Sequence, residues 1–171
     1  PWRGQYNEGA IRMARRAFFA QCTHIDHQIR LILGLLREFG LLDNTVIALT
    51  CDHGDMLGNH HLWHKGVFYE DSARIPLLLL PAARDLRTPI GRRDDRLAAL
   101  CDVMPTLLEF CDIPVPAEVE GLSLVGPKRR EEIYGEHFTG PLATRMVRDA
   151  RYKLIYYAVG NRFQLFDLDE D

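Results

Sequence analysis

A long apolar stripe near the start of the chain constrains the fold more than any other feature. Between residues 11 and 36 apolar side chains recur every three or four positions, at Ile11, Ala14, Phe18, Cys22, Ile25, Ile29, Ile32 and Leu36. This period is that of an α-helix with one apolar face. Gly40 marks the expected end of the helix, because glycine is common just past a helix C-terminus.

A short apolar strand follows this helix. Residues 45–51 are β-branched at the start and apolar throughout, which favours a strand buried on both faces of a parallel sheet covered by helices. A helix, a turn and a buried strand make half of an α/β unit. Ligands of such sheets bind at the carboxyl ends of the strands. Asp52 and His53 stand at that end, so their position alone makes them site candidates.

The rest of the chain predicts a mixed architecture in two parts. Residues 77–80 predict a second buried strand, and residues 97–111 a helix with Pro105 near its first turn. Four short, partly alternating runs separated by turn residues predict an antiparallel meander, at residues 132–137, 144–148, 152–157 and 163–168. We therefore expect an α/β core in residues 1–127 and a small antiparallel β subdomain in residues 128–171.

Composition narrows the class of protein. The chain has 171 residues, of which 47% are hydrophobic and 26% charged, the profile of a globular protein. The net charge of -3 gives no reason to expect nucleic acid or an anionic membrane as a partner. The longest apolar runs are too short to span a bilayer. Because the chain starts at Pro1, we expect a fragment at both ends.

The cysteines indicate which cellular compartment to expect. No C-x-x-C pair occurs, and each cysteine lies in or beside an apolar segment, at Cys22, Cys51, Cys101 and Cys111. This pattern favours buried free thiols over a disulfide framework. Free thiols in turn favour a reducing compartment, so we expect a cytoplasmic protein, with a periplasmic or secreted one as the alternative.

The segment CDHGDMLGNHHLWHK, residues 51–65, gathers side chains that bind ions. An Asp carboxylate beside a His imidazole can bring two donors to one divalent ion, and Lys65 can hold an anionic oxygen as a point charge. Each also has a plainer interpretation, the pair as a turn or helix cap and the lysine as a solvated surface residue. His60 and His64 are spaced as in H-E-x-x-H, but no Glu follows His60, so zinc is the weaker alternative.

The combined spacing of these residues resembles the sulfatase family of the alkaline phosphatase superfamily. The matching motifs span nearly the whole chain: Asp52-His53-Gly54, Leu57-Gly58, His60, Leu62-Trp63-His64-Lys65-Gly66, Tyr69-Glu70, Arg74-Ile75-Pro76, Asp102-Val103-Met104-Pro105-Thr106-Leu107, Glu120-Gly121-Leu122-Ser123-Leu124 and Tyr152-Lys153-Leu154-Ile155. The likeness is greatest to the Asp-His subgroup, which includes choline-type and iduronate-type sulfatases and the phosphonate monoester hydrolases.

This resemblance implies a fold, an activity and a set of site residues. The fold is part of an alkaline-phosphatase-like sheet sandwiched by helices. The activity is hydrolysis of sulfate esters of a small molecule or sugar, with phosphonate or phosphate monoesters as the alternative. Asp52 and His53 are implied as ligands of a divalent cation, Ca²⁺ first and Mn²⁺ or Mg²⁺ as alternatives. Lys65 is implied as the catalytic contact to a sulfate oxygen, and His64 is a candidate second contact to the substrate.

One family feature is missing from the sequence. The resemblance implies a formylglycine nucleophile made within a C/S-x-P-S-R motif, and no such motif occurs in these 171 residues. We therefore expect the C-terminal portion of a sulfatase that lacks the nucleophile and about half of the metal ligands. Such a chain is expected to be inactive alone and to self-associate through an exposed sheet. A catalytically inactive truncated product is the remaining alternative.

Overall fold

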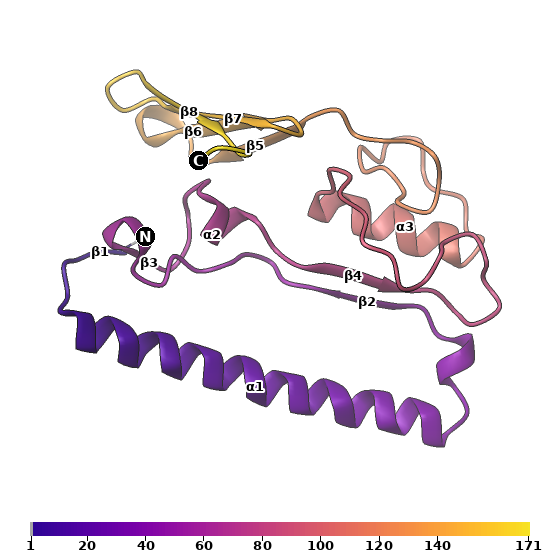
Figure 1. Ribbon diagram of the computed structural model, residues 1–171. Coiled ribbons are helices and arrows are strands. Elements are labelled where there is room, and N and C mark those ends of the chain that lie inside the picture. The colour runs from indigo at the N-terminus through magenta and orange to yellow at the C-terminus, as the bar shows by residue number, and fades with distance from the viewer. Residues whose placement is uncertain (1) are drawn as a thin grey trace. The chain divides into compact units, whose positions relative to one another are not determined.

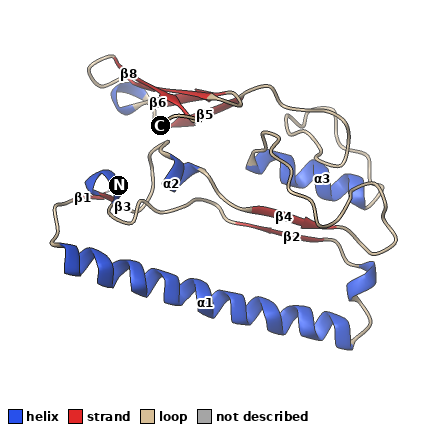
Figure 2. Cartoon of the chain, in the orientation of Figure 1, coloured by secondary structure: helices blue, strands red, loops and turns tan. Residues whose placement is uncertain are grey.

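The structure is a computed structural model that describes residues 2–171 (Figure 1). The chain divides into two compact units, one ending at Leu86 and the other starting at Arg87. Each unit combines helices with antiparallel strands (Figure 2), so the expected mixed α/β character is confirmed. None of the helices in the described residues has both the length and the apolar character needed to cross a membrane.

The long helix α1 (Glu8–Glu38) confirms the apolar stripe as a helix. Its first turn is capped by Asn7, whose side-chain oxygen accepts a hydrogen bond from the Ala10 N–H at 2.8 Å. Its last turn is followed by Gly40 with φ of 67°, the left-handed conformation that glycine adopts without strain. The 3₁₀-helix Leu42–Asn44 then forms the turn that leads into the first unit's longer strands.

Two pairs of strands complete the first unit. Strand β2 (Ile47–Thr50) pairs antiparallel with β4 (Leu77–Leu80), so that Thr50 lies opposite Leu77. Strand β1 (Trp2–Arg3) pairs antiparallel with β3 (Leu62–Trp63). Two short elements lie between β2 and β4, the 3₁₀-helix Asn59–His61 and the helix α2 (Glu70–Ala73).

The expected parallel pairing of the strand at residues 45–51 is wrong. The sequence run indicated burial on both faces, but β2 and β4 are antiparallel and Leu49, Leu78 and Leu80 remain exposed. An apolar run indicates that both faces of a strand can be covered, and it contains no information about the direction of the neighbouring strand. Direction depends on which segment pairs with it, and that is decided by tertiary contacts.

Several apolar faces stay uncovered within this chain. Helix α1 has no fully buried residue, and its exposed apolar side chains include Met13, Phe19, Ile25, Ile32, Leu35 and Phe39. The four cysteines are free, as expected, but all are exposed rather than buried. The expectation of burial failed because the cysteines lie in or beside apolar segments whose neighbours in this chain do not cover them. Self-association through such surfaces stays a prediction.

The second unit contains the predicted helix and meander. The 3₁₀-helix Leu100–Asp102 leads into α3 (Val103–Phe110), in which Pro105 is the third residue. An antiparallel sheet follows in the order β5 (Ile133–His137), β6 (Thr144–Arg148), β7 (Tyr152–Tyr157) and β8 (Arg162–Asp167), with a 3₁₀-helix at Gly140–Leu142. All four strands fall where the alternating runs predicted them. A domain boundary between residues 127 and 128 stays a prediction.

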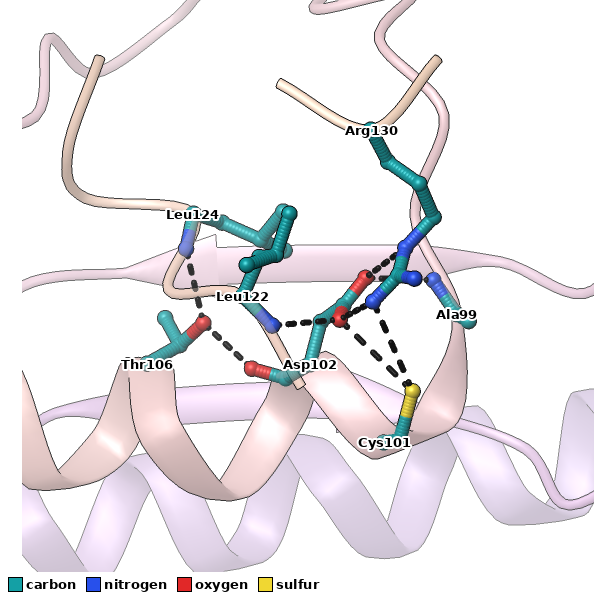
Figure 3. Close-up of polar contacts among 7 residues, drawn as sticks. All are labelled: Ala99, Cys101, Asp102, Thr106, Leu122, Leu124 and Arg130. Atoms are coloured by element: carbon teal, nitrogen blue, oxygen red, sulfur yellow. Dashed lines mark hydrogen bonds and ion pairs between the residues drawn. The ribbon is translucent and has the colours of Figure 1, made fainter. Parts of the chain in front are cut away.

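A buried ion pair joins α3 to the loop that leads into the sheet (Figure 3). The Asp102 carboxylate is fully buried and accepts hydrogen bonds from the Arg130 guanidinium at 2.5 Å and from the Leu122 and Ala99 N–H groups at 2.8 and 2.9 Å. The Thr106 hydroxyl donates to the Asp102 carbonyl at 2.5 Å and accepts from the Leu124 N–H at 3.0 Å. The loop is therefore attached to the start of the helix by several polar contacts.

The protonation of Asp102 follows from these contacts. Burial by itself raises the pKa of this carboxyl, but the hydrogen bonds from Arg130, Leu122 and Ala99 outweigh it, so the pKa lies below its usual range. A carboxyl with a lowered folded-state pKa stabilises the fold fully above its unfolded pKa of about 3.9. That contribution is lost as the pH falls through the lower folded-state value.

We predict that Asp102→Asn lowers the free energy of unfolding by about 3 kcal/mol at pH 7, because it leaves the Arg130 charge without its buried partner. Acidification below about pH 4 should lower the free energy of unfolding less in this variant than in the native chain, because the variant lacks a carboxyl with a lowered pKa. Urea denaturation at pH 7 and pH 3 measures both effects. Equal acid sensitivity of the two proteins would contradict the prediction.

Candidate functional site

The candidate site begins at the turn that follows β2. Gly54 donates its N–H to the Ser72 carbonyl at 2.9 Å, which joins this turn to α2. A Cβ on Gly54 would lie only 2.0 Å from the Asp71 carbonyl oxygen, so no other residue fits without movement of the backbone. The turn is therefore held against α2 at one defined position, and Asp52 and His53 precede it directly.

The His53 ring is oriented by this turn. Its Nδ1 lies 2.8 Å from the Gly54 carbonyl oxygen, which can only accept, so Nδ1 carries the proton. The other ring nitrogen, Nε2, lies 3.2 Å from the Asp52 carboxylate and also contacts the Lys65 ammonium. The Asp52 carboxylate accepts the His53 N–H at 3.1 Å through its other oxygen. The expected adjacency of Asp52 and His53 just past a strand end is confirmed.

Lys65 reaches His53 because the intervening chain folds back on itself. We call residues 56–64 the histidine-rich loop. Its two ends are joined by the Met56 N–H, which donates to the His64 carbonyl at 2.8 Å, and inside it the Gly58 N–H donates to the Leu62 carbonyl at 2.9 Å. Met56 itself is fully buried. The loop thus returns the backbone to the strand end, and Lys65 follows its last residue.

The backbone of this loop is strained. Four non-glycine residues have positive φ: Leu57 at 48°, His60 at 53°, His61 at 58° and His64 at 66°. Each such residue costs about 1–3 kcal/mol and persists only where surrounding contacts hold it. Strain of this kind concentrates at functional sites, so it is a second reason to examine this loop.

Side chains from elsewhere in the first unit hold the loop in place. Arg15 of α1 donates to the Leu57 carbonyl and to the Asn59 side-chain oxygen, both at 2.8 Å. The Asn59 amide donates to the Asp71 carboxylate of α2 at 2.8 Å. The His60 ring stacks on the Tyr69 ring with centroids 4.7 Å apart. Sequence reasoning missed Arg15, Asn59 and Asp71, because no local pattern relates residues so far apart in the chain.

Three of the four predicted site residues come together. In the structure His53 contacts both Asp52 and Lys65, while the roles of the three as ligands and catalytic group stay predictions. His64 precedes Lys65 and closes the loop through its carbonyl, and its contact with substrate also stays a prediction. Within residues 2–171 no group of three or more His, Cys, Asp or Glu side chains is arranged to hold a metal ion, either around Asp52 and His53 or around His60 and His64.

The trio is open to ligands. The Asp52 side chain is 83% exposed and the His53 side chain 36% exposed. A carboxylate and a neutral imidazole nitrogen are donors for a divalent cation, and the adjacent ammonium can bind an anionic oxygen. The hydrogen bond from Nδ1 to Gly54 is the type of contact that fixes the tautomer of a metal-binding histidine. The geometry therefore suits an anion held jointly by a cation and a lysine.

The thiol of Cys101 is not a comparable candidate. Although Cys101 is exposed as a residue, partial desolvation of its sulfur and the neighbouring Asp102 carboxylate raise the pKa of this thiol, which disfavours the reactive thiolate. Its sulfur lies 3.6 Å from an Asp102 oxygen and 3.7 Å from an Arg130 nitrogen, inside the structural ion pair of Figure 3. We therefore assign Cys101 a structural role beside Asp102 and Arg130 and do not consider it a nucleophile.

Comparison with known proteins agrees with this geometry. Residues 58–171 match the family described as N-sulphoglucosamine sulphohydrolase, C-terminal. An arylsulfatase from Clostridium perfringens is 37% identical over 175 residues, covering 99% of this chain and 36% of the relative. A choline-sulfatase from Rhizobium meliloti is 34% identical over 178 residues, covering 96% of this chain and 33% of the relative.

A solved structure extends the likeness to the fold. The phosphonate monoester hydrolase from Silicibacter pomeroyi aligns with a TM-score of 0.86 at 26% identity, covering 98% of this chain and 37% of that chain. The chain thus spans about a third of the length of the relatives it matches.

We predict that Gly54→Ala destabilises the chain by about 1–3 kcal/mol, because the new methyl group overlaps the Asp71 carbonyl and must displace the turn. Gly34→Ala is the matched control, since a Cβ there meets nothing within 4 Å and alanine favours the interior of α1. Urea denaturation compares the two. A Gly54→Ala variant as stable as the native chain would contradict the close approach described above.

Proposed function

The chain belongs to the sulfatase family, and on that premise we propose that it supplies part of the active site of a hydrolase that cleaves sulfate esters. The observation that carries the proposal is the convergence of the Asp52 carboxylate, the His53 Nε2 and the Lys65 ammonium just past the end of β2. The trio combines donors for a divalent cation with a positive charge for the substrate. Sulfate esters are anionic, so they match both.

Members of the family bind a divalent cation, and the residues present fit one. Asp52 would provide a carboxylate oxygen and His53 its Nε2, because Nδ1 is engaged by the Gly54 carbonyl. The ion, when bound, neutralises charge on the sulfate group and polarises it. Ca²⁺ is our first candidate because carboxylate oxygens suit it, with Mn²⁺ or Mg²⁺ as alternatives.

Lys65 is proposed as the catalytic contact to a sulfate oxygen. Its ammonium is a compact charge with three donors, and such a group stabilises the negative charge that develops as the ester bond breaks. The histidine-rich loop places Lys65 beside His53, so the lysine is already at the site before substrate arrives. His64 is proposed as a second substrate contact, because it is adjacent to Lys65 in the chain.

The substrate class is proposed as a sulfate ester of a small molecule or sugar. The name of the matched family, which refers to sulphoglucosamine, supports a sugar, and the arylsulfatase and choline-sulfatase relatives support small molecules. A phosphonate or phosphate monoester is the second candidate, favoured by the high structural similarity to the phosphonate monoester hydrolase. A cytoplasmic location, expected from the unpaired cysteines, stays a prediction.

We predict that Lys65→Ala lowers kcat for an aryl sulfate about 100-fold or more in the protein that carries this chain together with a formylglycine segment. Lys128→Ala is the control, because Lys128 is an exposed lysine of the other unit. Parallel assays with an aryl phosphonate monoester decide between the two substrate classes. Unchanged kcat in Lys65→Ala would remove Lys65 from the proposed mechanism.

We further predict that the 171-residue chain alone does not turn over an aryl sulfate and binds Ca²⁺ weakly. It has no C/S-x-P-S-R motif to supply the nucleophile, and two protein ligands fall short of the roughly six to eight oxygens that Ca²⁺ prefers. Calorimetric titration with Ca²⁺ and Mn²⁺ measures the affinity, with Asp52→Ala as the test variant and Asp94→Ala as the control. Micromolar binding abolished by Asp52→Ala would show a more complete site than we propose.

A further inference from the structure

The Asn59 side chain links two helices across the histidine-rich loop. Its amide oxygen accepts a hydrogen bond from the Arg15 guanidinium of α1 at 2.8 Å. Its amide nitrogen donates to the Asp71 carboxylate of α2 at 2.8 Å. Arg15 and Asn59 are 44 positions apart in the chain, and Asn59 and Asp71 are 12 apart. Both ends of one amide are therefore used to attach the loop to its surroundings.

The same part of α2 also holds the strand-end turn. The Asp71 carbonyl lies against Gly54, and the Ser72 carbonyl accepts the Gly54 N–H at 2.9 Å. The Gly54 carbonyl in turn accepts the proton on His53 Nδ1. Helix α2 therefore contacts two parts of the site. The Asp71 side chain binds Asn59 in the loop before Lys65, and the backbone of Asp71 and Ser72 holds Gly54, whose carbonyl orients His53.

The loop needs such an attachment. Four of its non-glycine residues have left-handed backbone conformations, which favour reopening unless tertiary contacts oppose it. Two backbone hydrogen bonds join its flanks, at Met56 and Gly58. Asn59 lies where the loop turns back, and its side chain accepts from Arg15 and donates to Asp71.

We propose that Asn59 is a positioning residue: it holds the histidine-rich loop closed between α1 and α2 and thereby keeps Lys65 beside His53. Asn59 acts through the loop and has no assigned contact with substrate. Its effect on catalysis rests on the proposed function, whereas its effect on the loop does not. Asparagine suits this place because it offers one acceptor to a guanidinium and one donor to a carboxylate.

The test uses an isosteric change and its compensating partner. Asn59→Asp keeps the acceptor for Arg15 but places a second carboxylate against Asp71. Amide hydrogen exchange at Met56 and Gly58, read by NMR on the 171-residue chain at pH 7, should accelerate about tenfold or more. Combining Asn59→Asp with Asp71→Asn restores a donor opposite an acceptor, so exchange should return to within about threefold of the native rate.

A matched pair of arginine variants controls for general effects on α1. Arg15→Gln should accelerate exchange at the same two amides, because it weakens the contacts with Leu57 and Asn59. Arg12→Gln changes an arginine of the same helix that pairs with Glu8 at 2.8 Å, and should leave both amides at their native rates. Native exchange in Asn59→Asp, or no recovery in the double variant, would overturn the proposal.

Catalysis provides the second readout. In the protein that carries a formylglycine segment, Asn59→Asp should lower kcat for an aryl sulfate about tenfold or more, and the double variant should recover most of it. Normal kcat in Asn59→Asp despite an opened loop would overturn the link between the loop and Lys65. If the native protein hydrolyses no sulfate ester while the exchange pattern holds, the proposed function fails and the structural role of Asn59 stands.

Discussion

The close approach of Gly54 to α2 is the contact on which the candidate site depends. The absence of a side chain lets the turn after β2 lie against the Asp71 carbonyl and donate its N–H to Ser72. The Gly54 carbonyl then fixes the proton of His53 on Nδ1, which directs Nε2 toward Asp52 and Lys65. A larger residue at this one position would move the turn and with it both predicted ligands.

Asp102 and Asp52 show how burial distinguishes a structural carboxylate from one that can bind a ligand. Asp102 is fully buried, and its oxygens are occupied by Arg130 and by two backbone N–H groups, so it has little capacity left for a ligand. Asp52 is mostly exposed, and it contacts the His53 imidazole, which in turn contacts the Lys65 ammonium. A satisfied buried carboxylate specifies the fold, whereas an exposed one beside spare donors can bind ions.

The histidine-rich loop has a strained backbone, and it places Lys65 beside His53. Its left-handed residues are unfavourable by themselves, and contacts from α1 and α2 offset that cost. The closed loop thereby places Lys65 near the end of β2. The exposed apolar stripe of α1 belongs to the same unit. The chain spans about a third of the length of its relatives, so in a longer protein further residues can cover this stripe.

Local patterns in the sequence determined the elements: the stripe from Ile11 to Leu36 is α1, the alternating runs after residue 127 are β5–β8, and Asp52 and His53 stand just past a strand. These features depend on residues close in the chain. Only the tertiary structure decided the antiparallel direction of β2, the exposure of the cysteines, the contact of Lys65 with His53 and the partners of Asn59. Each of these depends on a contact made in space, and periodicity contains no record of which distant residue will supply it.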